Sequence, residues 1–448
     1  MITYTLDSNI PLFESLYRCI RDDILAGRLV AGEKLPSKRQ LSQHLQVSKS
    51  TVEVAYGQLL AEGYIYSKEK VGYFVESVAP RPFSPAALPA EAEAPAPPAA
   101  PQDSLFPFSV WARLLRRVMA DYGAKILAPL PAAGVPELRQ SIARYLQGSR
   151  QLSVAPDQIV VGAGTDFLYN VLIQLLGREL RYGVEEPGFT KITAVYRANG
   201  IHPIPVPLDS DGVTVEALQS ADVVHLSPAH HYPTGIITPV RRRQELLEWA
   251  GEEKWIIEDD YDSEFRFTGR PIPPMTAMDK HGRVIYINSF SKTLAPGLRI
   301  SYMVLPRALM AQFKEKLGFY ACTVPGFEQY TLAKFLEEGY FEKHLNRMKK
   351  HYRDRRAALL QALAPLEPQC RVVGSGGGLH FLLVLPIAPS EAQIQSLAVG
   401  GLRIQRLSHY YGGLAPEFAP RTLVADYSAG GEGTELARRL AEILKAVP

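Results

Sequence analysis

One lysine stands among groups that suit a phosphate-bearing aldehyde cofactor. A Ser-x-Ser-Lys motif, ending in Lys292, follows the apolar run 284–287, and Arg299 comes shortly after it. An amine can form a Schiff base with an aldehyde, while hydroxyl groups and a guanidinium bind a phosphate dianion. We therefore expect Lys292 to bind pyridoxal 5'-phosphate, with Ser289, Ser291 and Arg299 holding its phosphate. Taken alone, the Ser-x-Ser-Lys motif would favour a solvated loop lysine, but Arg299 and the motifs described below reverse that order.

A group of acids follows a second short apolar run, residues 255–257. The cofactor works as an electron sink only when its ring nitrogen stays protonated beside a carboxylate. Polar groups at the carboxyl end of a buried strand lie where α/β proteins place their sites. One of Glu258, Asp259 and Asp260 is expected to hold the ring nitrogen, and Tyr261 to contact the 3'-oxygen. Spacing does not choose among the three acids, and a solvated acidic loop is the alternative.

Two further segments suit the same site. The apolar run 159–161 leads into a glycine turn that contains Gly164, Thr165 and Asp166, and a helical pattern follows. Such a turn presents backbone N–H groups to an anion, so it is expected to form another part of the phosphate site. Phe189 follows a Pro-Gly pair and can stack on the pyridine ring, although an aromatic residue there also suits a core.

The composition is that of a globular protein with more than one domain. The chain has 448 residues, of which 46% are hydrophobic and 21% charged, with a net charge of +3. This charge is too small to indicate nucleic acid by itself, so the positions of the cations matter. The first residues lack a basic region followed by an apolar run, and no apolar segment approaches membrane-spanning length. We expect a cytoplasmic protein with no membrane partner.

The cysteines and histidines do not predict a metal centre. Cys19, Cys322 and Cys370 lie far apart and form no Cys-x-x-Cys pair, so neither a disulfide framework nor a zinc site is expected. His230 and His231 are adjacent, but no other ligand type is spaced to join them.

Residues 8–75 predict three helices followed by a hairpin. Apolar residues at four-residue spacing predict the first helix. Ser37 begins a capping-box pattern for the second helix, and Ser48 suits the N-cap of the third. Two strands are expected at 64–66 and 71–75.

Two short helices, the second with small polar and basic residues at its amino end, suit a helix-turn-helix that reads the major groove of DNA. Cations around these helices would neutralise phosphates. The residues expected near DNA are Lys38, Arg39, Ser48, Lys49, Ser50, Thr51, Lys68 and Lys70. A small helical protein-interaction domain is the alternative, because acids keep this unit nearly neutral.

The remainder of the chain divides into a linker and a larger domain. Residues 77–104 are rich in proline and alanine, which predicts an extended, semi-rigid linker. From residue 105 to 448 apolar strands alternate with amphipathic helices, the pattern of an α/β domain with a largely parallel sheet. A small C-terminal α/β subdomain is expected from about residue 305.

Residues 1–76 resemble the winged helix-turn-helix of GntR-type repressors. The resemblance lies in the segments 35–42, 47–52 and 72–75, and it covers the whole unit. It implies that Arg39, the start of the recognition helix and the wing glycine Gly72 lie on DNA.

Residues 105–448 resemble a fold-type I aminotransferase domain, and the whole chain resembles the MocR/GabR group of transcriptional regulators. The motifs Glu-x-Pro-Gly-aromatic, His-x-aromatic-Pro-Thr-Gly, Glu-Asp-Asp-Tyr-Asp and Ser-x-Ser-Lys occur in the order typical of that group. The resemblance implies that Lys292 is the Schiff-base lysine, Asp259 the partner of the ring nitrogen, Tyr261 the 3'-oxygen contact and Phe189 the stacking ring. It also implies a head-to-tail homodimer whose operator binding responds to a small amine, an amino acid or the cofactor itself.

Some positions depart from the patterns of related proteins. Tyr232 stands where enzymatic aminotransferases have asparagine, and Lys191 stands where the regulator that responds to γ-aminobutyrate has arginine. A lysine cannot make the bidentate fork of a guanidinium, so the effector is expected to be bound differently. Lys191 and Arg421 are the expected effector contacts, with Arg403 as the alternative carboxylate clamp.

Three functions remain compatible with these residues. The first is a transcriptional regulator that senses pyridoxal phosphate or its adduct with an amine. The second is a catalytically active aminotransferase with an accessory DNA-binding domain. In the third, the cofactor site only stabilises a dimer.

Overall fold

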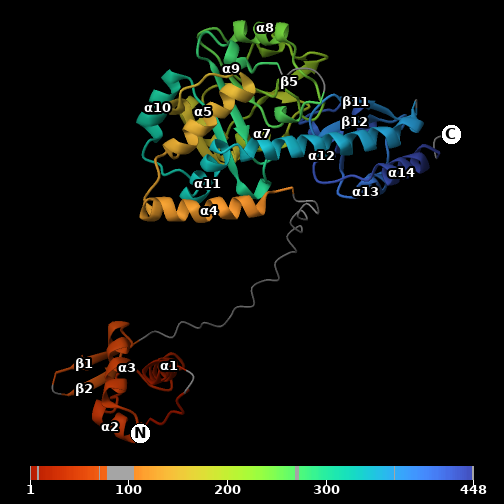
Figure 1. Ribbon diagram of the computed structural model, residues 1–448. Helices are drawn as coiled ribbons and strands as arrows, with labels where there is room; N and C mark the ends of the chain where they lie inside the picture. The colour runs from red at the N-terminus through yellow and green to blue at the C-terminus, as the bar shows by residue number, and fades with distance from the viewer. Residues whose placement is uncertain are drawn as a thin grey trace. The chain divides into compact units, whose positions relative to one another are not determined.

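The computed structural model describes residues 2–7, 10–69, 71–77, 105–267, 272–367 and 369–445. The chain divides into two compact units, Met1–Pro98 and Ala99–Pro448 (Figure 1). Almost all of the expected linker, 77–104, lies outside the described residues, and so does Lys70.

The first unit has the expected three helices and a hairpin. Its elements are α1 (Leu12–Leu25), α2 (Lys38–Leu45), α3 (Lys49–Ala61), β1 (Ile65–Lys68) and β2 (Gly72–Val75). Strands β1 and β2 pair antiparallel, with Ile65 opposite Val75. The strands begin one residue later than the sequence pattern indicates, and β1 extends two residues further toward the tip.

Local signals in the sequence explain where these helices begin. The Ser37 side chain accepts a hydrogen bond from Gln40 N and the Gln40 side chain returns one to Ser37 N, which confirms the capping box. Ser48 caps α3 by accepting from Thr51 N. Between them Gln46 turns the chain in the left-handed region, with φ 52°. Leu16, Leu41, Tyr56 and neighbouring apolar side chains form one buried core.

An eight-stranded, largely parallel sheet organises the second unit. In spatial order its strands are β3 (Ile159–Ala163), β10 (Ile300–Val304), β9 (Val284–Ser289), β8 (Trp255–Asp259), β7 (Val223–Leu226), β4 (Tyr182–Glu186), β5 (Ile204–Asp209) and β6 (Gly212–Val213). The five strands from β9 to β5 run parallel. Strand β10 pairs antiparallel with both of its neighbours.

Helices cover both faces of this sheet. Helices α6 (Thr165–Leu176), α7 (Thr190–Ala198) and α10 (Arg307–Leu317) share one core with it. Helices α4 (Phe108–Tyr122), α5 (Pro136–Arg150), α11 (Gly326–Glu337), α8 (Val240–Ala250) and α9 (Met275–Met278) contribute to the cores of the opposite face. Side chains along β3 alternate between the two faces, Val160 joining the first core and Ile159 and Val161 the second. The α/β prediction is confirmed.

The small subdomain contains a four-stranded antiparallel sheet. Its spatial order is β11 (Arg371–Val373), β12 (His380–Val384), β14 (Thr422–Asp426) and β13 (Arg403–Arg406). Helices α13 (Glu391–Leu397) and α14 (Gly433–Lys445) accompany it. The subdomain begins later than residue 305, because α10 packs in the core beside α6 and α11 packs against α4 and α5.

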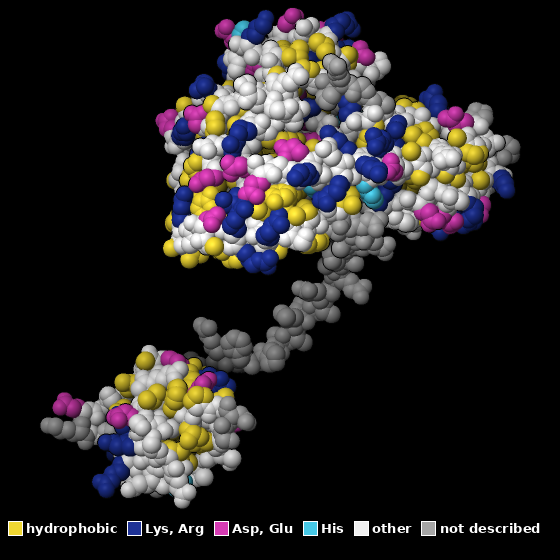
Figure 2. All heavy atoms as spheres, viewed as in Figure 1, with side chains coloured by type: hydrophobic (Ala, Val, Ile, Leu, Met, Phe, Trp, Pro, Cys, Tyr) yellow, Lys and Arg dark blue, Asp and Glu magenta, His cyan; other side chains and the backbone are white. Residues whose placement is uncertain are grey.

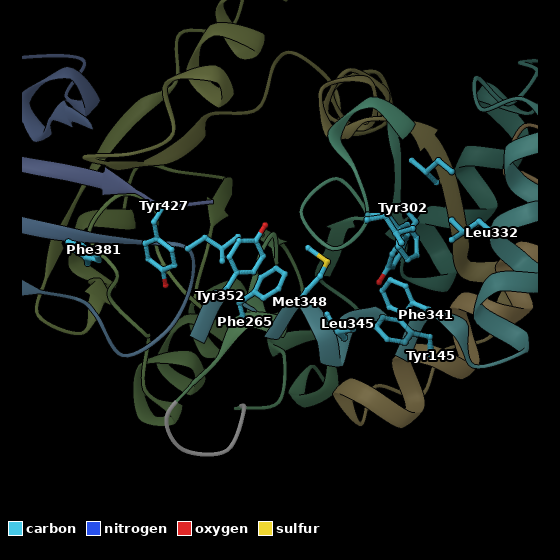
Figure 3. Close-up of a cluster of buried hydrophobic side chains, with 14 of the residues drawn as sticks. Tyr145, Phe265, Tyr302, Leu332, Phe341, Leu345, Met348, Tyr352, Phe381 and Tyr427 are labelled. Atoms are coloured by element: carbon cyan, nitrogen blue, oxygen red, sulfur yellow. The ribbon is translucent and has the colours of Figure 1, made fainter. Parts of the chain in front are cut away.

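Helix α12 (Tyr340–Leu363) joins the two subdomains (Figure 1). Near its start, Phe341 meets Tyr145 of α5 with ring centroids 5.0 Å apart, and further along Tyr352 meets Phe265 at 5.1 Å. The same hydrophobic cluster continues to Phe381 and Tyr427 beside the small sheet (Figure 3). One continuous core therefore supports both sheets.

Two sequence expectations concern the cysteines and membrane segments. Cys19, Cys322 and Cys370 are all free thiols, and Cys370 is buried. No helix within the described ranges combines the length and apolar character that crossing a bilayer requires.

Candidate functional site

A cavity of about 430 Å³ lies where side chains of the large and small sheets meet. Eight of the predicted cofactor-binding residues line it, namely Thr165, Phe189, Asp259, Tyr261, Ser289, Ser291, Lys292 and Arg299. Lys191 also lines it. Several of these side chains stand at or just beyond the carboxyl ends of strands, the usual position of sites in α/β proteins.

Lys292 projects from the turn that follows β9. Its Nζ lies 3.8 Å from Asp426 Oδ2, and its side chain is about one third exposed. A partly exposed amine on a cavity wall can reach a small aldehyde that enters the cavity. The structure thus places Lys292 as its predicted role requires, and that role stays a prediction.

A chain of hydroxyl groups stands beside this lysine. Ser301 Oγ donates to Ser289 Oγ at 3.0 Å, and Ser289 Oγ donates to Ser291 Oγ at 2.9 Å. The Ser291 backbone N–H also donates to Ser289 Oγ. These bonds fix the orientation of two hydroxyl groups on the cavity wall, as phosphate binding requires.

Arg299 has a left-handed backbone, with φ 53°, and its guanidinium donates to Asp166 Oδ1 at 2.5 Å. Burial pushes the pKa of Asp166 upward, but hydrogen bonds from Arg299 and from backbone outweigh this and lower it. A Cβ on Gly164 would stand 2.2 Å from Arg299 Nη2, so glycine makes room for the guanidinium. Gly164 and Asp166 thus stand next to the Arg299 guanidinium, and neither lines the cavity.

The first turn of α6 faces the same region. Its N-cap residue, Gly164, has no side chain that could cap the helix, so the positive end of α6 points toward this region. The Gly164 N–H itself donates to Gly162 O, so Gly164 does not supply a free donor.

The three neighbouring acids at the end of β8 have different partners. Glu258 accepts hydrogen bonds from Met275 N and Thr276 N, and Asp260 pairs with the buried Arg150 at 2.7 Å. Asp259 alone of the three lines the cavity. This geometry favours Asp259 as the partner of a pyridine nitrogen.

Asp259 is oriented by groups that the sequence reading missed. Its Oδ2 accepts a hydrogen bond from the Tyr169 hydroxyl and lies 3.5 Å from His225 Nε2. Its Oδ1 is buried and has no hydrogen-bond partner in the part of the chain that the structure describes. Tyr169 follows Thr165 by one helical turn on α6, a spacing that could have identified it.

Tyr261 belongs to a buried polar cluster. Its hydroxyl lies 3.3 Å from His230 Nδ1, which is also 3.0 Å from Asp262 Oδ2. His380 of β12 joins them, and potential ligand atoms of His230, Asp262 and His380 lie within 4.8 Å of one another. The spacing of these residues in the sequence did not indicate that their side chains lie close together. Burial raises the pKa of Tyr261 well above its ordinary range, so its hydroxyl stays protonated.

Phe189 and Tyr232 form an aromatic side of the cavity. Phe189 is 44% exposed, and its ring centroid lies 5.9 Å from that of Tyr232 in an edge contact. Tyr232 and Tyr410 place their hydroxyl oxygens 2.7 Å apart, and Tyr410 donates to Gln405 Oε1. An exposed aromatic face at this place can stack on a planar ligand.

The expected effector contacts are only partly brought together. Lys191 lines the cavity, with Nζ 3.3 Å from Asp166 Oδ2. Arg421 is exposed at the end of a short 3-10 helix and does not line the cavity. Arg403 of β13, the alternative clamp, does line it, together with Gln405. The position of Arg403 therefore suits a carboxylate better than that of Arg421.

Some of the residues predicted to contact DNA already interact with other side chains of the first unit, and others do not. Lys38 pairs with Glu53 at 2.7 Å, and the Ser48 hydroxyl is used as the cap of α3. Arg39 and Lys49 are exposed, and neither has an ion pair with a described residue.

The other candidates near DNA lie on α3 and the hairpin. Ser50 and Thr51 place their hydroxyl oxygens 2.7 Å from Ser48 Oγ. Lys68 lies over the Phe74 ring, 4.9 Å from its centroid, and Gly72 has φ 133°.

Both units match known protein families. Residues 12–75 match the family of bacterial regulatory proteins called gntR, and residues 101–409 match the family of class I and II aminotransferases. The HTH-type transcriptional regulator YdeL of Bacillus subtilis is 38% identical over 423 residues, which cover 91% of each chain. The probable rhizopine catabolism regulatory protein MocR of Rhizobium meliloti is 35% identical and covers 79% of this chain and 78% of its own. The pyridoxine biosynthesis regulator PdxR of Corynebacterium glutamicum is 32% identical over 96% of this chain and 94% of its own.

Solved structures of aminotransferases share the fold of the second unit. The multiple substrate aminotransferase of Thermococcus profundus is 25% identical with a TM-score of 0.65, covering 78% of this chain and 90% of its own. The kynurenine aminotransferase of Pyrococcus horikoshii is 26% identical with the same TM-score and coverage.

The cavity residues fit the cofactor of that fold. Lys292 offers an amine, Ser289, Ser291 and Arg299 offer phosphate donors, and Asp259 offers a buried oxygen that lacks a partner among the described residues. The chain therefore belongs to the family of HTH-type transcriptional regulators that join a gntR-family DNA-binding domain to a class I and II aminotransferase domain, and pyridoxal 5'-phosphate is the cofactor of that domain.

Proposed function

We propose that the operator affinity of this regulator depends on pyridoxal 5'-phosphate held at Lys292, alone or joined to a small amine or amino acid. The observation that carries the proposal is Asp259 Oδ1, a buried carboxylate oxygen without a partner among the described residues, in the cavity that Lys292 lines. An unpaired buried carboxylate oxygen is costly, and a protonated ring nitrogen would satisfy it.

Each neighbouring residue has a defined role in this proposal. When bound, the cofactor supplies an aldehyde that captures amines. Tyr169 and His225 orient Asp259, while Ser289, Ser291 and Arg299 bind the phosphate. Lys191 and Arg403 provide positive charge for an effector carboxylate on the cavity wall.

The proposal extends to DNA and to assembly. Arg39 and Lys49, exposed and without ion pairs to described residues, would bind operator phosphates or bases. The protein would act in the cytoplasm as a head-to-tail homodimer, an arrangement that would place two winged-helix units on paired half-sites.

The test combines an absorption titration with a mobility-shift assay. Purified full-length protein is titrated with pyridoxal phosphate, and its binding to the DNA upstream of its own gene is measured with and without the cofactor. We expect a visible band from lysine-bound cofactor and a cofactor-dependent change in operator affinity. A band with no change in DNA binding would contradict the proposal.

Variants of the first unit test the DNA contacts. Arg39→Ala and Lys49→Ala should weaken operator binding and reduce its salt dependence, since each removes a cation that can release counterions from DNA. Arg18→Ala is the matched control, because Arg18 is on α1 and paired with Glu14. Intact binding by both variants would refute the DNA-contact assignment.

The second candidate function is transamination, which the likeness to two aminotransferase structures supports. Many turnovers of amino-group transfer, together with an operator affinity that is the same with and without ligand, would favour this function.

A further inference from the structure

Three carboxylates line the cavity, and one of them faces Lys292. Asp259 faces Tyr169, and Asp262 faces His230. The third is Asp426, the last residue of β14. Its Oδ1 accepts a hydrogen bond from Ser428 N at 2.8 Å, and its Oδ2 lies 3.8 Å from Lys292 Nζ. Asp426 therefore stands beside the nitrogen at which amines would be exchanged.

The position of Asp426 is set by the small sheet. In the register of that sheet Asp426 stands opposite both His380 of β12 and Arg403 of β13. The Asp426 side chain is only 15% exposed, and Lys292 is the only cation within ion-pair distance of it in the described ranges. When Lys292 is linked to the cofactor, this carboxylate has no free ammonium group as its partner, and a ligand cation can take that place.

Aromatic rings surround the same part of the cavity. Tyr232 lies at ring-centroid distances of 5.3 Å from Tyr410 and 6.3 Å from Tyr261. Its hydroxyl is engaged with that of Tyr410, so the two rings contribute mainly their apolar surfaces. Aromatic surfaces beside a carboxylate attract an ammonium group.

The other titratable groups near Asp426 are poor proton acceptors from an ammonium. Burial raises the pKa of Tyr232, Tyr261, Tyr352, Tyr410 and Tyr427, so these side chains are neutral and protonated. Arg403 is a cation. His380 is the other candidate proton acceptor, because burial and neighbouring positive charge lower its pKa and leave a neutral imidazole.

We infer that Asp426 docks the incoming amine and accepts its proton. The inference rests on the proposed function. Asp426 takes one proton from the effector ammonium, whose nitrogen then bonds to the cofactor's aldehyde carbon as the bond from that carbon to Lys292 Nζ breaks. The attacking nitrogen gives a second proton to the departing Lys292 nitrogen, and Asp426 passes the proton that it holds to the same nitrogen. Lys292 is thereby released as an ammonium group, Asp426 is again a carboxylate, and atoms and charge balance. The final pair, an ammonium beside a carboxylate, is the Lys292–Asp426 contact of the present structure.

The test compares a charged amine with a neutral nucleophile of similar size. Full-length protein loaded with pyridoxal phosphate is mixed with ethylamine or with O-methylhydroxylamine, and the loss of the lysine-bound band is timed between pH 6 and 9. Only ethylamine must lose a proton before it can react. Asp426→Asn should slow ethylamine at neutral pH by roughly a hundredfold, leave O-methylhydroxylamine unchanged, and make the ethylamine rate climb more steeply with pH.

A second readout separates docking from exchange. Borohydride reduction fixes the lysine–cofactor bond, and calorimetry then measures ethylammonium binding alone. Asp426→Asn should weaken that binding several-fold, and it keeps an oxygen for the Ser428 N–H. Asp354→Asn, an exposed acid on α12, is the matched control.

The outcomes distinguish the two proposals. No visible band in the wild-type protein would contradict the proposed function itself. With the band intact, equal slowing of both nucleophiles by Asp426→Asn would show a purely structural role and overturn the inference. Unchanged ethylamine rates in Asp426→Asn, with slowing in His380→Asn, would assign the proton to His380 instead.

Discussion

The two walls of the cavity are built in different ways. The large-sheet wall takes Asp259 from the last position of β8 and Ser289 from the last position of β9, with Lys292 in the turn beyond. The small-sheet wall takes Arg403 and Gln405 from alternate positions of β13, and Asp426 from the end of the neighbouring β14. The first wall can be read from contiguous motifs, whereas the second exists only through strand register.

This difference suggests that the two walls have different functions. The large-sheet wall carries the groups that a pyridine, a phosphate and an aldehyde require, and these requirements are common to the fold. The small-sheet wall presents a cation, an amide and a carboxylate toward whatever enters beside the cofactor. We therefore expect changes in the first wall to affect cofactor binding and changes in the second to affect effector choice.

The largest effect is expected from Lys292→Ala. Removing the amine should abolish the visible band of lysine-bound cofactor completely while the protein stays folded, because the Lys292 side chain is about one third exposed and, among the described residues, pairs with Asp426 alone. Absorption spectra and borohydride trapping measure this. Lys191→Ala is the control and should keep the band. A reducible band in Lys292→Ala would show that another lysine binds the cofactor.

Substitutions of two neighbouring carboxylates should affect different quantities, protein stability for Asp260 and cofactor affinity for Asp259. Asp260→Asn leaves the buried Arg150 without its charged partner, which should cost about 3–5 kcal/mol of unfolding free energy. Asp259→Asn should change the stability of the cofactor-free protein little. It should lower the affinity for the cofactor by roughly ten- to a hundredfold, because a charge-assisted hydrogen bond is lost. Denaturant unfolding and cofactor titration measure the two quantities. The reverse ranking would remove Asp259 from its assigned role.

The small-sheet wall should select for a carboxylate. Arg403→Gln should weaken the response to 4-aminobutanoate by about tenfold and leave the response to ethylamine, which has no carboxylate, unchanged. Arg421→Gln is the matched control, because Arg421 does not line the cavity. The concentration that gives half of the spectral change measures both. An effect of Arg421→Gln alone would restore that residue as the clamp.

A smaller effect concerns pH and a buried acid behind the large-sheet wall. Burial raises the pKa of Glu185 to about 8, with the Ser227 N–H opposing the shift and the charge of Asp259 adding to it. The folded state therefore holds a proton that the unfolded state releases above its ordinary pKa. Stability should fall as pH rises from about 5 to 8, by no more than about 1.4 kcal/mol per pH unit. Glu185→Gln should flatten this slope in thermal unfolding, whereas an unchanged slope would contradict the prediction.

The fold could be predicted from the sequence because its signals are local. Capping at Ser37 and Ser48 was readable from residue types, and both caps are present. The start of the small subdomain was placed too early, because α10 follows β10 directly yet packs back onto α6, and nothing in its amphipathic pattern tells which sheet it covers.

The site could be predicted in part. Residues adjoining strand ends were found, since a strand end fixes their place, whereas His225 and Asp426 were missed because their partners come from distant segments. Of the two candidate clamps, Arg403 lies in the small sheet opposite Asp426 and lines the cavity, whereas Arg421 ends a 3-10 helix before β14 and does not line it. The sequence alone did not give this difference, because it depends on the pairing of distant strands.

The 24-residue helix α12 has a consequence for signalling. Its length of about 36 Å makes it a stiff rod, and one end is embedded beside α5 while the other reaches α14. Because side chains of α12 belong to the core that supports both sheets, a displacement of the small sheet relative to the large one would also change the packing of this helix. The helix thus couples the packing around α5 mechanically to that around α14, over its whole length.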